Sequence, residues 1–334
     1  MARSVRLVTA QNELVERLQS GIRRGDRASL ARGITLVESR NAADMPAAEA
    51  LLRALLPHAG QAMRIGITGA PGVGKSTLIE SLGLRLCEAG RKVAVLAVDP
   101  SSVVTGGSIL GDTTRMTGLS RDARAFIRPS PGGDTLGGVA ARTREAMLLC
   151  EAAGFDTVLV ETIGTGQSEV AVHGMVDFFL LLLSPAAGDE LQGIKRGVME
   201  LADGILVHKA DGDLAAAADR AAQQCMLALR VLHAGEMEPP PVVVGSSVTG
   251  RGLAEMWQAI EQWLANRRAD GRLAHRRAQQ AGDWLEQTVR ERLLADFLAD
   301  PQTAAAMAEA RAKVAAGAEL PTAAARSVLA RRHD

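Results

Sequence analysis

Short, almost wholly apolar runs recur along the middle of the chain, and segments of helical periodicity separate them. The apolar runs are MRIGIT (63–68), RKVAVLAVDP (91–100), ARAFIRP (123–129), DTVLVET (156–162), DFFLLLLSP (177–185), GILVHK (204–209) and PPVVVGSS (240–247). The helical patterns cover residues 75–89, 135–153, 190–202, 213–233 and 251–267. This alternation is typical of a mostly parallel sheet covered by helices on both faces, so the sequence predicts an α/β fold.

Polar residues follow the apolar runs at the points where parallel strands would end. They come after residue 68 and at Asp99, Glu161, Ser184, His208 and Ser246. In α/β folds the carboxyl ends of the strands meet at one edge of the sheet, and ligands bind there. We therefore expect a binding site built from the loops at this edge.

The two ends of the chain have helical patterns without strands. We predict a helical N-terminal extension at 1–60, the α/β domain at 61–267 and a helical C-terminal arm at 268–334. The arm is either a solvated amphipathic tail or an oligomerisation arm, because an apolar stripe outside the main core must be buried somewhere.

Composition narrows the class of protein. Hydrophobic residues make up 47% of the 334 residues, aromatic residues only 2%, and the formal net charge is zero. Nucleic-acid surfaces usually show a basic excess or aromatic stacking platforms, so no nucleic-acid partner is expected. The longest apolar run, 178–185, is too short to cross a bilayer, and the start of the chain lacks the apolar core of a signal peptide. We expect a cytoplasmic protein with no membrane partner.

The three cysteines, Cys87, Cys150 and Cys225, lie far apart in the sequence. Their spacing does not match that of zinc ligands or of a disulfide framework, so neither kind of site is expected. A reducing compartment is the natural environment for such thiols.

The segment GAPGVGKST at 69–77 fits the phosphate-binding pattern G-x-x-x-x-G-K-[ST], and it follows a predicted strand and opens a predicted helix. Its glycines allow backbone N–H groups to surround a β-phosphate. Lys75 would place its charge on the β- and γ-phosphates, and the Ser76 hydroxyl would bind Mg²⁺. A purely structural glycine turn is the disfavoured alternative. The residues expected to bind the nucleotide here are Gly72, Val73, Gly74, Lys75, Ser76 and Thr77.

Three acids are candidates for the magnesium site that a P-loop requires. Asp99 ends the strand that follows the P-loop helix, and Glu161 ends a later strand before a glycine-rich turn. Asp112 lies in the loop GGSILGDTTRM. For a single acid at such a position, a helix cap is the ordinary alternative.

The stretch HKADGD at 208–213 resembles the [Asn]-Lys-x-Asp base loop of P-loop GTPases. The Asp211 carboxylate would accept hydrogen bonds from guanine N1–H and N2–H₂, a donor pair that adenine lacks, and the Lys209 stem would lie over the base. His208 stands where asparagine is usual. A ring nitrogen can replace one of the asparagine hydrogen bonds, but one edge of an imidazole cannot offer both a donor and an acceptor. GSSVTGRG (245–252) resembles the second guanine loop, in which backbone N–H groups of Ser246, Ser247 and Val248 would donate to guanine O6.

Several motifs together resemble one family. GAPGVGKST, AVDPSS…GGSILGDTTRM, VETIGTGQSE, GDELQGIKRGVMELAD and HKADGD are similar to those of the MeaB/ArgK GTPases, over roughly residues 10–330. These proteins are G-protein chaperones of methylmalonyl-CoA mutase. The resemblance implies a homodimeric, Mg²⁺-dependent GTPase with a P-loop GTPase fold. It also implies that the protein binds the adenosylcobalamin-dependent mutase, gates cofactor loading and protects the mutase from inactivation.

The same resemblance assigns roles to individual residues. Lys75 and Ser76 match the P-loop pair, and the loop PAAGDELQGIKRG (185–197) matches the region called switch III. The switch II segment ETIGTGQSE lacks the glutamine that follows the DxxG pattern of Ras-like proteins, and Gln167, the candidate to touch the attacking water, lies at a distance from the turn. We therefore expect slow intrinsic hydrolysis that the partner stimulates. Asp99, Asp112 and Glu161 match the catalytic acids around Mg²⁺, and Asp189, Gln192 and Lys195 match signalling residues of switch III.

Two other functions are compatible with a P-loop. A kinase would pass phosphate to a small acceptor and should carry an acceptor pocket and usually a lid, whereas this sequence carries a guanine loop. A metal-insertion GTPase, as in urease or hydrogenase maturation, needs soft or imidazole ligands beside the nucleotide, but the cysteines and histidines are scattered here. Product analysis separates the kinase from the GTPase.

Overall fold

The computed structural model describes residues 2–98, 116–129, 136–162, 168–185, 196–232 and 239–330. Asp99, Asp112, Gln167, Asp189, Gln192 and Lys195 lie outside these residues. The N-terminal helices predicted for 1–60 are confirmed as α1 (Ala2–Arg23), α2 (Arg27–Val37) and α3 (Met45–Leu55), followed by the short 3₁₀ helix η1 (Leu56–His58).

The described residues form a seven-stranded sheet, and every strand pair in it is parallel. Its order is β3-β2-β4-β1-β5-β6-β7. Because β1 lies between β4 and β5, its carboxyl end is flanked by the ends of two later strands, as a central nucleotide loop requires. The strands are β1 (Met63–Gly69), β2 (Val93–Val98), β3 (Ala125–Arg128), β4 (Thr157–Thr162), β5 (Phe178–Leu183), β6 (Gly204–Val207) and β7 (Val242–Val244).

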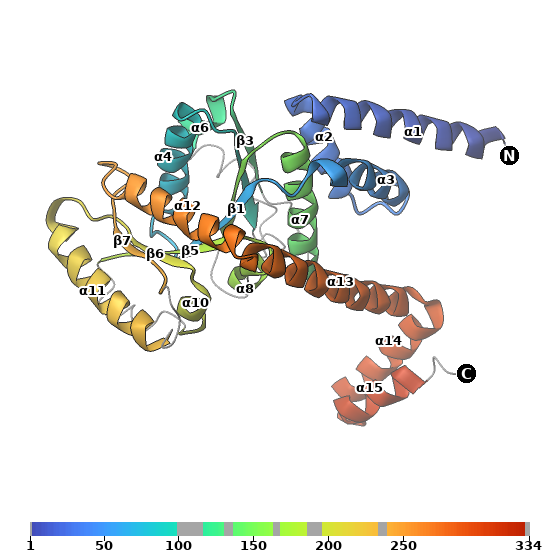
Figure 1. The fold of residues 1–334 in the computed structure, drawn as a ribbon. Coiled ribbons are helices and arrows are strands. Elements are labelled where there is room, and N and C mark those ends of the chain that lie inside the picture. The colour runs from blue at the N-terminus through green and yellow to red at the C-terminus, as the bar shows by residue number, and fades with distance from the viewer. Residues whose placement is uncertain are drawn as a thin grey trace. The chain divides into compact units, whose positions relative to one another are not determined.

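Helices lie on both faces of the sheet, as the alternating pattern predicts (Figure 1). Two short helices, α6 and α8, were not predicted, since five or six residues are too few to show helical periodicity. The helices after β1 are α4 (Lys75–Glu88), α6 (Thr117–Arg121), α7 (Leu136–Ala152), α8 (Ser168–His173), α10 (Arg196–Leu201), η2 (Gly212–Leu214), α11 (Ala215–Leu232), α12 (Leu253–Ala269), α13 (Arg272–Ala299), α14 (Pro301–Ala315) and α15 (Pro321–Ala330). None of the described helices is long and apolar enough to pass through a membrane.

Strand β5 shows why the central runs are continuously apolar. Phe178, Leu180 and Leu182 pack into the core on one face of the sheet, and Phe179 and Leu181 pack on the other. Both sets are fully buried, because successive side chains of a strand point to opposite faces. The sheet therefore has no solvent-facing side at its centre, and polar chemistry is confined to the strand ends.

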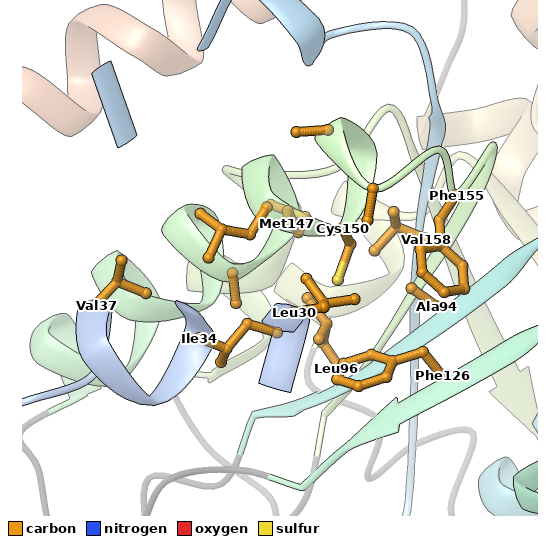
Figure 2. Packing of buried hydrophobic residues seen from close by; sticks show 14 of the residues in the cluster. Leu30, Ile34, Val37, Ala94, Leu96, Phe126, Met147, Cys150, Phe155 and Val158 are labelled. Atoms are coloured by element: carbon orange, nitrogen blue, oxygen red, sulfur yellow. The ribbon is translucent and has the colours of Figure 1, made fainter. Parts of the chain in front are cut away.

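The N-terminal helices pack into the core of the α/β domain. Figure 2 shows Leu30 and Ile34 of α2 beside Met147 and Cys150 of α7, close to Phe126 of β3. Leu30 and Ile34 are almost fully buried, so α2 contributes to the stability of the sheet's helical layer.

By packing, the chain divides into two compact units, Met1–Ala278 and Gln279–Asp334. The division falls inside α13. In the second unit, Ala306 of α14 and Ala324 and Val328 of α15 are buried. The three-part division expected at residues 60 and 267 stays a prediction.

A charged cluster ties the first turns of α13 to the amino ends of the strands. Arg277 donates from Nε to Asp177 Oδ1 at 2.7 Å and from Nη2 to Asp177 Oδ2 at 2.6 Å. Its Nη2 also donates to the carbonyl oxygen of Ala62 at 2.7 Å. The Asp177 carboxylate is buried and also accepts the backbone N–H of Arg64 at 2.9 Å. This bidentate pair therefore fixes α13 to the starts of β1 and β5.

Replacing Arg277 by methionine should lower the free energy of unfolding by about 3–5 kcal/mol, because the change leaves a buried carboxylate without its cation. The measurement is a urea titration of the purified protein, read as a lower midpoint at constant slope. Arg290→Met is the matched control, since Arg290 forms an exposed pair with Glu286, and it should cost under about 0.5 kcal/mol. Equal losses in the two variants would contradict the role given to Arg277.

Candidate nucleotide site

The P-loop connects β1, which ends at Gly69, to α4, which begins at Lys75. Gly74 has φ +103°, in the left-handed region that favours glycine, and a Cβ there would lie 2.7 Å from the ring of His208. A residue with a side chain at position 74 would therefore have to push the histidine away. The glycine pattern is thus needed both for the turn and for the close approach of a neighbouring loop.

Lys75 lies folded back over the loop. Its Nζ donates to the carbonyl oxygen of Gly69 at 2.7 Å and to that of Ala70 at 3.3 Å. Burial lowers the pKa of Lys75, and the charges of Glu161 and Glu169 oppose this effect. The loop therefore holds a desolvated ammonium group whose charge phosphate oxygens could neutralise.

Ser76 and Glu161 bring two oxygen ligands together beside the P-loop. The Ser76 hydroxyl donates to Glu161 Oε1 at 2.9 Å. Glu161 is buried near the carboxyl end of β4, opposite Ile67 of β1 in the register. A hydroxyl and a carboxylate are hard oxygen donors, which fit Mg²⁺, and this ion commonly combines one or two protein ligands with substrate phosphates.

The base loops follow β6 and β7, whose ends are paired at Val207 and Val244. Lys209 has φ +60°, the only described non-glycine residue in the left-handed region, and its Nζ donates to the carbonyl oxygen of Gly72 at 2.7 Å. Such strain is commonly found at functional sites. The stem of Lys209 therefore crosses from the base loop to the P-loop.

Asp211 is held in place by the second base loop. The Ser246 hydroxyl donates to Asp211 Oδ1, and Ser246 Oγ accepts the backbone N–H of Val248 at 3.2 Å. The backbone N–H of Ala210 donates to Gly245 O at 3.0 Å, which joins the two loops directly. The structure thus brings together the carboxylate and the backbone segment that the sequence assigned to the base.

His208 has two partners on opposite edges of its ring. Nδ1 lies 2.8 Å from the carbonyl oxygen of Val73, and Nε2 lies 2.7 Å from the Ser247 hydroxyl and 3.3 Å from the Ser247 backbone nitrogen. A carbonyl can only accept, so Nδ1 carries the proton and Nε2 of the neutral ring is an acceptor. This arrangement agrees with the chemistry of the imidazole: its donor and its acceptor lie on two edges of the ring, whereas an asparagine amide would offer both from one end.

Comparison with known proteins decides the family. A sequence model described as "Methylmalonyl Co-A mutase-associated GTPase MeaB" matches residues 30–302. The chain belongs to the MeaB family. The Escherichia coli protein GTPase ArgK is 48% identical over 84% of this chain and 85% of its own length. The mouse methylmalonic aciduria type A homolog, mitochondrial, is 44% identical over 93% of this chain and 78% of its own.

The crystal structure of a LAO/AO transport system kinase has the same fold, with a TM-score of 0.75 and 37% identity, covering 96% of this chain and 98% of that one. The predicted P-loop GTPase architecture is therefore confirmed. This MeaB-family protein is a GTPase.

The structure adds two acids that the sequence motifs did not indicate. Glu80 of α4 accepts the backbone N–H groups of Gly118 at 2.7 Å and of Leu119 at 3.2 Å, and so holds the start of α6 against the P-loop helix. Glu169, near the start of α8, is buried, and its negative charge raises the pKa of Lys75. Glu80 lies beyond the Ser/Thr position at which the P-loop pattern ends, and Glu169 is only the last residue of VETIGTGQSE. The sequence patterns therefore give neither residue a role, and only the packing does.

Proposed function

We propose that this GTPase is a guanine-specific, Mg²⁺-dependent G-protein chaperone of adenosylcobalamin-dependent methylmalonyl-CoA mutase, acting in the cytoplasm. It would gate cofactor loading and protect the mutase from inactivation. The observation that carries guanine specificity is the Asp211 carboxylate, held by Ser246 at the edge of the sheet where the P-loop also lies. The mutase as partner is supported by the family to which the chain belongs and by its mouse relative.

The residues of the site would divide the work between phosphates and base. Lys75 would exchange its contacts with Gly69 O and Ala70 O for phosphate oxygens, without a large move of its stem. Mg²⁺ would neutralise charge on the β- and γ-phosphates, and Ser76 and Glu161 would hold it together with Asp99 and Asp112. The nucleotide would also contact Gly72–Thr77, Lys209, Asp211 and the backbone of Ser246–Val248.

Hydrolysis would rely on positioning and electrostatics rather than on covalent chemistry. Gln167, from the switch II segment, is the candidate to orient the attacking water. A slow intrinsic rate would follow if the partner completes or orders this arrangement. Asp189, Gln192 and Lys195 of switch III are our candidates for transmitting the partner's presence to the nucleotide.

The experiment that tests the chaperone role is a pull-down with purified methylmalonyl-CoA mutase. The protein should bind the mutase, and the amount bound should differ between GDP and a non-hydrolysable GTP analogue, because a nucleotide-gated chaperone must interact differently in its two states. Lack of binding in both nucleotide states would refute the mutase as partner while leaving the GTPase assignment intact.

We propose further that the protein is a homodimer joined through α13. Exposed apolar residues repeat every fourth position on one side of this helix, at Leu285, Val289 and Leu293. Such a row on a solvated helix indicates a surface that another protein covers. The resemblance to the MeaB/ArgK family, in which the C-terminal helices serve dimerisation, favours a second copy as the partner.

The double change Val289→Glu with Leu293→Glu should convert the dimer to a monomer, because two charges would be buried at the apolar interface. Analytical ultracentrifugation gives the mass in solution. Ala295→Glu is the control, since this exposed residue lies on another side of the same helix and should leave the dimer intact. A monomeric wild type, or a variant that stays dimeric, would contradict the assignment of this row.

A further inference from the structure

We propose that His208 is a positioning residue that clamps the P-loop to the second base loop in its neutral form, so that protonation of its ring weakens nucleotide binding. The inference rests on the proposed guanine site and adds to it a proton-linked element. It concerns the one position at which the base loop of this chain departs from the usual asparagine.

The His208 ring lies between the two halves of the site. On one edge it donates to Val73 O at 2.8 Å, inside the P-loop, and on the other it reaches Ser247 at 2.7 Å, inside the second base loop. Val73 is buried in the core against the sheet, so its carbonyl is a fixed point. The ring therefore sets the distance between the loop that would hold the phosphates and the loop that would hold the base.

Close packing holds the His208 ring in this position. The ring lies so near Gly74 that a Cβ there would be 2.7 Å from two ring atoms. His208 itself is buried, and its backbone N–H donates to Leu183 O at 2.8 Å, at the end of β5. The next residue, Lys209, also reaches the P-loop through Gly72 O. Two successive side chains thus tie the base loop to the P-loop, and only the histidine also reaches Ser247.

A proton on Nε2 would change the contacts of the ring with Ser247. In the neutral ring, Nε2 accepts from the Ser247 hydroxyl and faces the Ser247 backbone N–H at 3.3 Å. Protonation puts a hydrogen on Nε2, so the ring becomes a donor on both edges. The hydroxyl can rotate and accept instead, but the backbone N–H cannot, and two donors then face each other. The base loop must shift away, together with Ser246 and the Asp211 carboxylate that Ser246 orients.

Burial and the charges around the ring together favour its neutral form. Burial is the largest cause holding the pKa of His208 below its ordinary value of 6.5; the Lys209 charge adds to this effect, and the hydrogen bond to Val73 and the Asp211 charge oppose it. On the P-loop the nearest cation is Lys75, which is turned towards Gly69 and Ala70, and in the base loop Arg251 pairs with Asp219 at 3.6 Å. Strand β5 (Phe178–Leu183) carries no titratable side chain. The neutral clamp is therefore the form present at neutral pH.

The sign of the effect follows from this depressed pKa. Because burial holds this pKa below its ordinary value, the ring is neutral at neutral pH whether the nucleotide is bound or free, and affinity does not depend on this group there. As the pH falls through the pKa of the free protein's ring, protonated protein accumulates and must lose the proton to form the clamp. Affinity should then fall by up to about tenfold per pH unit, the limit for one linked proton.

An asparagine in the same place should behave differently. Its amide offers a donor and an acceptor that do not titrate, although its shorter side chain reaches less far. His208→Asn should therefore bind nucleotide at neutral pH, within about tenfold of wild type, and should lose the acid-side dependence that comes from the ring.

The test is the affinity for GDP and for a non-hydrolysable GTP analogue, measured by calorimetry from about pH 5.5 to 8, the range in which a histidine titrates. Both nucleotides carry phosphates that titrate in this range, and this contribution cancels in the difference between wild type and His208→Asn. We expect a steeper acid-side loss in the wild type. Equal slopes in the two proteins would overturn the inference, whereas a wild type that binds neither nucleotide at any pH would instead refute the proposed function.

His173→Asn is the matched control. His173 is also held at a lowered pKa by burial, but it packs edge-on against Phe179 and faces Arg276 and Asp203, at the opposite edge of the sheet. This variant should keep the wild-type slope, and loss of the slope here would place the linked proton elsewhere.

A measurement on the unmodified protein covers the case in which His208→Asn does not fold. In ¹⁵N-histidine NMR spectra of the wild type, the His208 ring should show the Nδ1–H tautomer, and its pKa should fall further when GDP is added. The Nε2–H tautomer, or a pKa that GDP leaves unchanged or raises, would overturn the inference.

Discussion

Replacement of Lys75 by alanine should lower kcat for GTP hydrolysis by about 10²–10³-fold, the usual cost of removing one preorganised charge-stabilising group. The reason is geometric. The Lys75 ammonium already lies inside the loop on the carbonyl oxygens of Gly69 and Ala70, so it needs little rearrangement to meet a developing negative charge. The measurement is steady-state phosphate release from GTP.

The fold of Lys75→Ala should be intact, because the Lys75 ammonium hydrogen-bonds to the carbonyl oxygens of Gly69 and Ala70, within its own loop. The urea midpoint should not fall. Lys92→Ala, an exposed lysine before β2 at the opposite edge of the sheet, is the control and should keep wild-type turnover. Unchanged turnover in Lys75→Ala would refute the P-loop assignment.

Replacement of Asp211 by asparagine should weaken GTP binding by about 10²-fold or more, because each hydrogen bond to a charged group contributes ~1.5–3 kcal/mol and two are at stake. The variant should instead favour xanthosine triphosphate, whose C2 carbonyl can accept from the new amide. The oxygen of asparagine can still accept from the Ser246 hydroxyl, so the loop should keep its shape.

Competition binding with the two nucleotides measures this exchange of specificity. Asp219→Asn, an exposed aspartate of α11 paired with Arg251, is the control and should leave GTP affinity unchanged. If GTP affinity is untouched in Asp211→Asn, the base contacts lie elsewhere and the guanine assignment is wrong.

The sheet and the P-loop could be predicted because their signals are local. A run such as FFLLLL can be buried on both faces only in a central strand, and the glycines of GAPGVGKST are required by the turn itself. Some apolar runs are longer than the strands they contain: PPVVVGSS holds only Val242–Val244 as a strand, because Gly245 and Ser246 already belong to the second base loop, where the Ser246 N–H donates to Arg251 O at 2.9 Å.

The contacts that define the site could not be predicted, because they join residues far apart in the sequence. His208 contacts a carbonyl 135 positions earlier and a hydroxyl 39 positions later, and nothing in HKADGD predicts either partner. Arg277 lies in an alternating charged stretch that usually indicates a solvated face, yet it reaches Asp177 across 100 positions. Tertiary packing alone decides which charges of an amphipathic helix become buried.

A mutase-stimulated GTPase can be recognised from one measurement: hydrolysis of GTP with and without adenosylcobalamin-dependent methylmalonyl-CoA mutase, with ATP as the competing substrate. We expect slow release of free phosphate from GTP, a faster rate when the mutase is added, and little turnover of ATP. Preference for ATP, phosphate transferred to a small acceptor, or a GTP rate that the mutase leaves unchanged would contradict this expectation.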